Sequence, residues 1–265
     1  MKLSIEHETI YRYDAPVRSS TQYLRLTPRE TSRQNVLHWQ IDTPRAATQT
    51  HDGYGNVLHV LTLDKTVREI RIRAHGVIES NPAAEDKPEP GATLSPLVFL
   101  RCTALTRPDE TLMRFAAKFR RQSAILTGLR DLASEVTRKL PGGQVETSEA
   151  QAASQAFGGG IGSVRDQAHV FIASCRHIGI PARFVSGYVL THGKEEAGIY
   201  CHAWTEAWVG DRWRGFDLAH SRASGTEHVA LAIGADYLDA CPIRGIRTGG
   251  GLETMEAHAR LNVGQ

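Results

Sequence analysis

The sequence lacks the features that mark membrane, secreted and nucleic-acid-binding proteins. Its 265 residues contain no apolar run long enough to span a bilayer. Charged Lys2 and Glu6 interrupt the first residues, which therefore offer no apolar signal-peptide core. The formal net charge is only +2, so no bulk charge favours nucleic acid or an anionic membrane surface. We therefore expect a cytoplasmic protein without nucleic-acid or membrane partners.

Cysteine is also scarce. The sequence holds four cysteines, far apart and without CxxC spacing: Cys102, Cys175, Cys201 and Cys241. In a cytoplasmic chain such cysteines are typical of reduced thiols and not of a disulfide framework. Histidine is more frequent, with 12 residues, but these are scattered. His169 and His177 share an expected helix without the i, i+4 spacing of a helical metal pair. The sequence therefore predicts neither a metal site nor a cofactor.

The first eighty residues have the alternation of amphipathic strands. Leu3 and Ile5 alternate with Ser4 and Glu6, and similar runs follow at 22–26, 36–41, 57–63 and 67–78. Residues 52–56 read Asp-Gly-Tyr-Gly-Asn, and such residues tolerate the positive φ of a hairpin turn. Many short strands separated by turn signals predict an antiparallel β-sandwich-like domain over residues 1–80.

The composition changes after residue 80. Residues 81–91 are rich in proline and charge, and we assign 81–100 to a linker and domain junction. Helical patterns follow at 107–119, 124–140 and 163–178, with a short alanine-rich helix before Gly158. Strand patterns return at 182–190, 200–209, 213–218 and 227–233. The chain is thus predicted to be α+β, with a second α+β domain over residues 101–265.

A series of motifs in the second half resembles the transglutaminase-like, papain-related superfamily. They are Gly-Ile-Pro-Ala-Arg at 179–183, Ser-Gly-Tyr at 186–188, His-Ala-Trp-Thr-Glu-Ala-Trp at 202–208 and Trp-Arg-Gly-Phe-Asp at 213–217. The strands of the first eighty residues and the tail from His228 to Gly245 are similar to bacterial transglutaminase-like proteins classed as candidate cysteine peptidases. The resemblance covers most of the chain and implies an N-terminal β domain followed by a transglutaminase-like core.

The resemblance implies roles for several residues. A thiol acyltransferase needs a thiolate, a neighbouring imidazole and a group that orients the imidazole. In the family, a cysteine at a helix start supplies the thiolate, because the helix dipole lowers its pKa. His202 and Asp217 match the second and third members of this Cys-His-Asp triad. Asp166 and Trp204 match positions that line the cleft.

The nucleophile position departs from the family pattern. Family members have Gly-x-Cys-x-Asp-x-Ala-His at the helix start, and residues 162–169 here are Gly-Ser-Val-Arg-Asp-Gln-Ala-His. The cysteine position is therefore occupied by Val164, which has no nucleophilic atom. Ser163 is an alternative nucleophile, but one helical step rotates a side chain by about 100°, and an N-cap role suits a serine there. Cys201 precedes His202 on an expected strand, so the two side chains should face opposite sides.

These observations predict a homologue of the bacterial cysteine peptidases that keeps the histidine and aspartate but lacks the cysteine. Its expected role is non-catalytic binding of a peptide or amide, or of a partner protein. One alternative is an active amide hydrolase or acyltransferase with another nucleophile or a His202-activated water. A second alternative is a purely structural or interaction module. The oligomeric state is left open.

Overall fold

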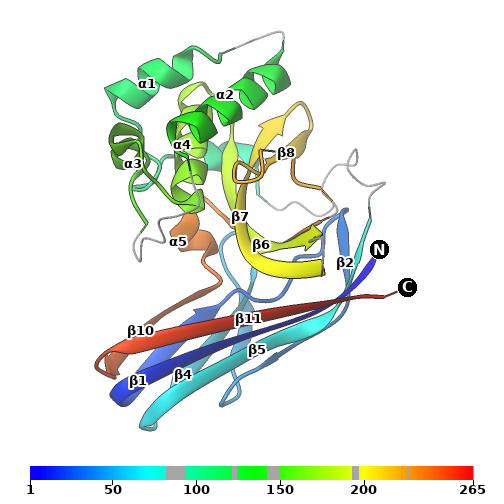
Figure 1. Cartoon of the computed structure of the whole chain (residues 1–265), viewed down its shortest axis with the longest axis vertical. Helices are drawn as coiled ribbons and strands as arrows, with labels where there is room; N and C mark the ends of the chain where they lie inside the picture. The colour runs from blue at the N-terminus through cyan, green and yellow to red at the C-terminus, as the bar shows by residue number, and fades with distance from the viewer. Residues whose placement is uncertain are drawn as a thin grey trace.

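A computed structural model describes residues 1–81, 94–120, 124–141, 150–192, 197–221, 223–225 and 227–264. A curled antiparallel sheet forms one end of the molecule, and helices packed on a smaller sheet form the other (Figure 1). Within the described ranges, no helix is both long and apolar enough to cross a membrane. The α+β class predicted from the sequence is confirmed.

The large sheet has 7 strands. They are β1 (Lys2–Leu24), β2 (Gln34–Asp42), β3 (Thr48–His51), β4 (Val57–Leu63), β5 (Val67–Ser80), β10 (Ile243–Gly249) and β11 (Glu253–Gly264). The order is β2-β5-β1-β4-β3, and β10 and β11 also pair with β1. Alternate residues of β1, such as Leu3 and Ile5, are buried, as their spacing predicts. The predicted hairpin turn at residues 52–56 joins β3 to β4.

Both ends of the chain contribute to this large sheet. β11 runs antiparallel to β1, with Lys2 opposite Gly264 and Tyr13 opposite Glu253, and β10 pairs with the second half of β1. The sequence interpretation assigned this tail to the second domain, over residues 101–265. The structure differs because the 23-residue β1 has a second long edge, which the tail covers. Covering it leaves fewer unpaired backbone groups on the central strand.

The second unit contains the helices and a 4-stranded sheet of order β8-β7-β6-β9. Its strands are β6 (Ala182–His192), β7 (Ala197–Val209), β8 (Arg212–Phe216) and β9 (His228–Gly234). Its helices are η2 (Pro96–Leu100), α1 (Glu110–Ala117), α2 (Ile125–Lys139), α3 (Ala153–Gly159), α4 (Val164–His177) and α5 (Tyr237–Ala240). The bounds of α1, α2, α3 and α4 lie close to the predicted ranges, because caps such as Asp109 and stops such as Gly179 are local signals. The short helices η2 and α5 were not predicted from the sequence.

One apolar core joins the two units. The inner face of the large sheet, with Leu3 and Ile5 among its residues, packs against Tyr188, Leu190 and Ile199 of β6 and β7. The N-terminal part is therefore a single curled sheet whose inner face the second unit covers. In a sandwich, a second sheet of the same domain would take that place.

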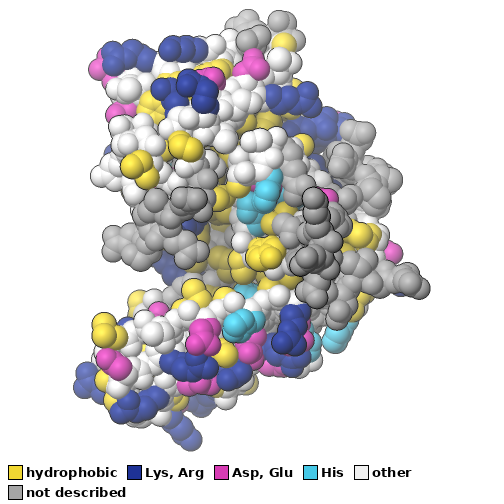
Figure 2. Space-filling view, in the orientation of Figure 1, with side chains coloured by type: hydrophobic (Ala, Val, Ile, Leu, Met, Phe, Trp, Pro, Cys, Tyr) yellow, Lys and Arg dark blue, Asp and Glu magenta, His cyan; other side chains and the backbone are white. Residues whose placement is uncertain are grey.

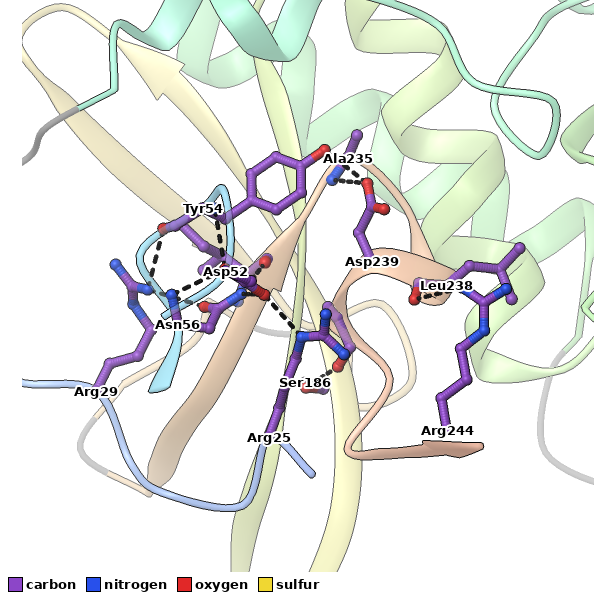
Figure 3. A network of polar contacts seen from close by, with 12 residues as sticks. Arg25, Arg29, Asp52, Tyr54, Asn56, Ser186, Ala235, Leu238, Asp239 and Arg244 are labelled. Atoms are coloured by element: carbon purple, nitrogen blue, oxygen red, sulfur yellow. Dashed lines mark hydrogen bonds and ion pairs between the residues drawn. The ribbon is translucent and has the colours of Figure 1, made fainter. Parts of the chain in front are cut away.

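A buried polar network strengthens the junction between the units (Figure 3). Asn56, which is 0% exposed, donates from Nδ2 to the carbonyl oxygen of Ile233 over 2.7 Å and accepts from the Ile233 N–H over 2.9 Å. Asp52 accepts from Arg25 over 2.7 Å and from Asn56 over 2.9 Å. The Tyr54 hydroxyl donates to Asp239 over 2.6 Å. The β3–β4 turn is thus hydrogen-bonded to β9 and α5 and fixes how the second unit sits on the first.

His7 of β1 should make stability depend on pH. Its side chain is buried at the junction, with Nδ1 2.9 Å from the hydroxyl of Tyr188, and burial lowers its pKa to about 4. Unfolded His7 takes up a proton near pH 6.5, whereas folded His7 does so only near pH 4, so stability is lost as the pH falls through that window. Between pH 7 and pH 4.5 we expect His7 to account for about 2 kcal/mol of the decrease in unfolding free energy.

Urea unfolding of His7→Gln at the two pH values tests this expectation, with exposed His51→Gln as the control. His7→Gln should lose less stability on acidification than wild type, and His51→Gln should lose as much as wild type. The fully buried His169, whose pKa burial also lowers to about 4, titrates in the same window and remains in both variants. Equal losses in all three proteins would contradict the assignment to His7.

Candidate functional site

The start of α4 is built by a capping box. Ser163 is the N-cap, and its N–H and its hydroxyl both donate to Asp166 Oδ2, over 2.7 and 2.8 Å. Val164 is the first helical residue and is half-buried. The N-cap role predicted for Ser163 is confirmed. Because its hydroxyl is committed to a carboxylate inside the cap, Ser163 is poorly placed to attack a substrate.

Asp166 has a structural role at the same helix start. Its side chain is 0% exposed and accepts hydrogen bonds from Ser163 and from the backbone of Gln151, over 3.2 Å. The sequence interpretation gave it a place in the cleft lining, and its burial corrects that assignment. A carboxylate in the first helical turn satisfies unpaired N–H groups and interacts favourably with the helix dipole.

His202 and Asp217 are brought together by the pairing of β7 with β8. Thr205 lies opposite Phe216, so Asp217 continues the edge strand beside Trp204. His202 Nε2 is 2.9 Å from Asp217 Oδ1, and both side chains are nearly inaccessible. The distance is that of a hydrogen bond, but the N–H direction is poorly aligned with the oxygen. The predicted histidine–aspartate pair is thus present as a close contact between imidazole and carboxylate.

Two further histidines contact the same carboxylate. His220 Nδ1 is 2.7 Å and His228 Nε2 is 2.9 Å from Asp217 Oδ2. His228 Nδ1 accepts from the N–H of Gly225 over 3.1 Å, which leaves the proton on Nε2 to be donated to Asp217. The sequence analysis gave neither histidine a role. The spacing of His220, three residues after Asp217, was a signal that could have suggested this contact.

The surroundings keep Asp217 charged. Burial by itself raises the pKa of its carboxyl, but the close contacts with His202, His228 and His220 lower it and outweigh burial. The pKa therefore lies well below its usual range. Asp217 is thus a buried, negatively charged carboxylate in contact with three imidazoles. It can stabilise a proton on His202 during acid–base chemistry.

Three of these groups are close enough together to be considered as metal ligands. Donor atoms of His202, Asp217 and His228 lie within 4.8 Å of one another. However, the Gly225 N–H fixes His228 in the tautomer whose Nε2 carries a proton, and a protonated nitrogen cannot ligate a metal. The arrangement therefore fits a hydrogen-bonded network better than a metal site.

Trp204 packs beside the imidazoles. Its ring stacks on His202 at a centroid distance of 6.3 Å and meets His228 edge-on at 5.1 Å. It is only 2% exposed and lines a small cavity of about 60 Å³ together with His228. Trp204 therefore holds the imidazoles in place and contributes little surface to an open cleft.

The two faces of β7 carry different groups. Ala203 and Ala207 belong to the core that α4 covers, where Phe171 of α4 meets Phe216 at 5.0 Å. Successive side chains of a strand point to opposite faces, so His202 points to the face of β7 opposite to that of Ala203. β7 is strongly curved in this region (Figure 1). The proximity of Val164 to the imidazole of His202 stays a prediction, which a thiol at residue 164 can test.

The cysteines lie elsewhere. Cys201 Sγ is 3.6 Å from His7 Nε2, on the side of β7 that faces the large sheet, as alternation predicts. Cys175 is fully buried in α4, and burial raises the pKa of its thiol far above the usual range. Cys241 Sγ lies 3.1 Å from the carbonyl oxygen of Ile243. These three thiols therefore do not contact the His202–Asp217 pair.

A cavity of about 400 Å³ lies beside Asp217, between α2, β8 and the segment that follows β8. Arginine and serine side chains contribute to its lining, together with Phe216. In the face shown in Figure 2, Lys and Arg side chains are scattered over the helical part among uncharged residues, and histidine side chains reach the surface near the centre of the view. The site thus combines an imidazole–carboxylate cluster with an adjacent space of ligand size.

Comparisons with known proteins agree with this architecture. A protein of Mycobacterium leprae described as uncharacterized is 27% identical over 281 residues, which cover 96% of both chains. An uncharacterized protein of Mycobacterium tuberculosis is 27% identical over 91% of this chain and 86% of its own length. The crystal structure of a candidate cysteine protease from Cytophaga hutchinsonii superposes with a TM-score of 0.79 at 20% identity, covering 99% of this chain and 90% of that one. At that identity the likeness shows the fold alone.

The family models match both parts of the chain. Residues 3–79 match the bacterial transglutaminase-like N-terminal region, and residues 114–218 match the transglutaminase-like superfamily. The second match ends just after Asp217 and includes the start of α4 and the β7–β8 pair. The chain therefore combines a region that matches the bacterial transglutaminase-like N-terminal family with a core that matches the transglutaminase-like superfamily.

Proposed function

We propose that this protein has no thiol catalysis and binds a peptide or amide ligand beside the His202–Asp217 pair. The observation that carries the proposal is Val164 at the first position of the capped helix α4. That position requires a cysteine in the motif of thiol-dependent relatives, and valine offers no atom for covalent attack. The retained pair, 2.9 Å apart, and the cavity beside it support a site that still accepts a ligand.

The cavity also favours this proposal over a purely structural module. A module without a ligand has no need for a buried carboxylate surrounded by imidazoles, since burying charge costs free energy. Here Asp217 is 0% exposed in its side chain and lies beside a space of about 400 Å³. A ligand-binding role accounts for both features.

We further propose that the protein acts in the cytoplasm.

One observation favours a second candidate function, hydrolysis of an amide by a His202-activated water. The depressed pKa of Asp217 keeps it anionic, so it can stabilise His202 as an imidazolium after proton abstraction. This chemistry needs no nucleophilic side chain. Ser163 is a weaker choice for such chemistry, because it is 9% exposed and bonded to Asp166.

Activity measurements separate these functions. Wild-type protein is incubated with a peptide library and an amine acceptor, with and without iodoacetamide. We expect no thiol-dependent activity, that is, no hydrolysis or transamidation that is lost on alkylation by iodoacetamide. Mass mapping with thiol- and serine-directed acylating probes should find no activity-linked adduct. Turnover that is lost on alkylation and in Cys201→Ser would overturn the proposal. Turnover that survives alkylation but disappears in His202→Ala would establish the hydrolase in its place.

A further inference from the structure

The cavity beside Asp217 has an uneven charge. Its lining includes Arg33, Arg130 and Arg214, whereas Asp217 is the acidic residue among the lining residues. Three imidazoles surround that carboxylate. The charge of Asp217 is therefore directed into the protein, and the cavity presents mainly positive charge. Positive charge in a concave site attracts anionic groups and raises their local concentration.

Both structural units supply these cations. Arg33 comes from the segment between β1 and β2 and donates to the carbonyl oxygen of Trp213 over 3.3 Å. Arg130 projects from α2, and Arg214 lies on β8. The hydrogen bond to Trp213 holds Arg33 against β8 of the second unit. The cavity is thus built where the two units meet and is more than a charged helix surface.

The cavity also offers hydroxyl groups. Ser134, Thr137 and Ser221 contribute to its lining, although Ser134 and Thr137 already donate their hydroxyl hydrogens to the backbone carbonyl oxygens of Arg130 and Ala133. Ser224, another lining residue, is only 7% exposed. Within the described part of the chain, its Oγ is buried without a hydrogen-bond partner. A buried hydroxyl that lacks a protein partner is satisfied by an acceptor or donor from a ligand or solvent.

Apolar atoms complete the walls. Leu126 and Ala133 of α2 contribute to the lining, together with Phe216 and Leu218, and all four belong to or pack on the adjacent apolar core. A bare inorganic anion would make no use of these apolar surfaces. A glutamate side chain combines a carboxylate for the arginines with methylene groups for the apolar walls, and about 400 Å³ accommodates a short segment of such a peptide.

We infer that this cavity binds a carboxylate-rich peptide through Arg33, Arg130 and Arg214. This inference rests on the proposed peptide-binding function, to which it adds the charge and side-chain class of the ligand. Guanidinium groups bind carboxylates in a planar, two-pronged geometry that Lys cannot reproduce. The acidic side chains would lie in the cavity, and the peptide backbone would pass Asp217 and its histidines.

Isothermal titration calorimetry with a Glu-Glu-Glu peptide tests the inference, with Gln-Gln-Gln as the uncharged peptide of the same shape. We expect the glutamate peptide to bind at least about tenfold more tightly, as charge-assisted hydrogen bonds imply. Arg130→Gln should weaken it by about tenfold. Arg138→Gln is the matched control, because Arg138 lies on the same helix but pairs with Glu135 over 2.7 Å. It should leave the affinity unchanged.

Three outcomes would overturn the inference. Equal affinity for the two peptides would show that charge is not recognised. Equal weakening by Arg130→Gln and Arg138→Gln would indicate a general basic surface. Binding of inorganic phosphate that depends on Arg130, without binding of the glutamate peptide, would show a phosphate site. None of these outcomes changes the thiol chemistry expected at residue 164. The acidic-peptide inference can therefore fail while the proposal that the protein lacks thiol catalysis still holds.

Discussion

Gly187→Ala is expected to destabilise the protein by about 3 kcal/mol or more, as severe overpacking does. Gly187 lies in β6, opposite His202 of β7 and Ala230 of β9. A Cβ atom there would lie 2.0 Å from the carbonyl oxygen of Val229 and 2.8 Å from the Trp204 ring. The first contact is with backbone, which cannot move without breaking the pairing of β6 with β9. The second would displace the ring that packs on His202.

Gly158→Ala is the matched control. Gly158 lies in α3, and nothing lies within 4 Å of the position of an added Cβ. Alanine at this helical position is expected to stabilise by about 0.5–1 kcal/mol. Urea unfolding of both variants gives the comparison. A Gly187→Ala protein within about 1 kcal/mol of wild type, well below the usual cost of overpacking, would show that β6, β7 and β9 pack less tightly than the structure indicates.

The elements that the sequence predicted well depend on local chemistry. α4 begins at the Ser163–Asp166 capping box and ends before Gly179, which has a φ of 86°. The β3–β4 turn has Gly55 at a φ of 75°. These residue types favour caps and turns wherever they occur. Their positions along the sequence were therefore sufficient to locate the elements.

The return of the tail to the large sheet could not be predicted in the same way. Residues such as Met255 and Ile246 are 57% and 75% exposed, so β10 and β11 carry little of the alternation that marks a half-buried strand. Their place is decided by backbone pairing with β1, at the other end of the chain. Strand pairing over such a distance depends on the edges that the rest of the fold leaves open.

The candidate site was predicted only in part. The motif spacing gave His202 and Asp217, because adjacent antiparallel strands bring such positions together. The motif spacing did not identify His220 and His228. His220 contacts Asp217 from the turn that follows β8, and His228 contacts it from the start of β9. Asp166 was assigned to the cleft although it closes a helix cap. A motif identifies a residue's position in a family, but the contacts of its side chain depend on the surrounding fold.

Val164→Cys is expected to create a thiol with a lowered pKa. The N-terminus of the 14-residue helix α4 favours a thiolate through its dipole. His202, held by anionic Asp217, can pair with the thiolate as imidazolium. Cysteine and valine have similar volume, so the half-buried position should accept the exchange with little strain.

The expected effect on reactivity is large. An ordinary cysteine with a pKa of about 8.5 is roughly 3% thiolate at pH 7, whereas a thiol with a pKa of about 7 or below is at least half ionised. Alkylation near neutral pH should therefore be about tenfold faster than at an ordinary thiol. Thr111→Cys is the matched control, because it places an exposed thiol in the first turn of α1. It has the helix dipole without the imidazole.

The decisive measurement is the pH dependence of iodoacetamide alkylation at residue 164, followed by mass mapping, in Val164→Cys and in the double variant Val164→Cys/His202→Ala. The proposed loss of catalysis from an otherwise retained site predicts rapid labelling of the single variant near neutral pH. It also predicts that the double variant labels at the rate of Thr111→Cys. A single variant that reacts no faster than Thr111→Cys, with no change on His202→Ala, would contradict the retained site and leave only the shared fold.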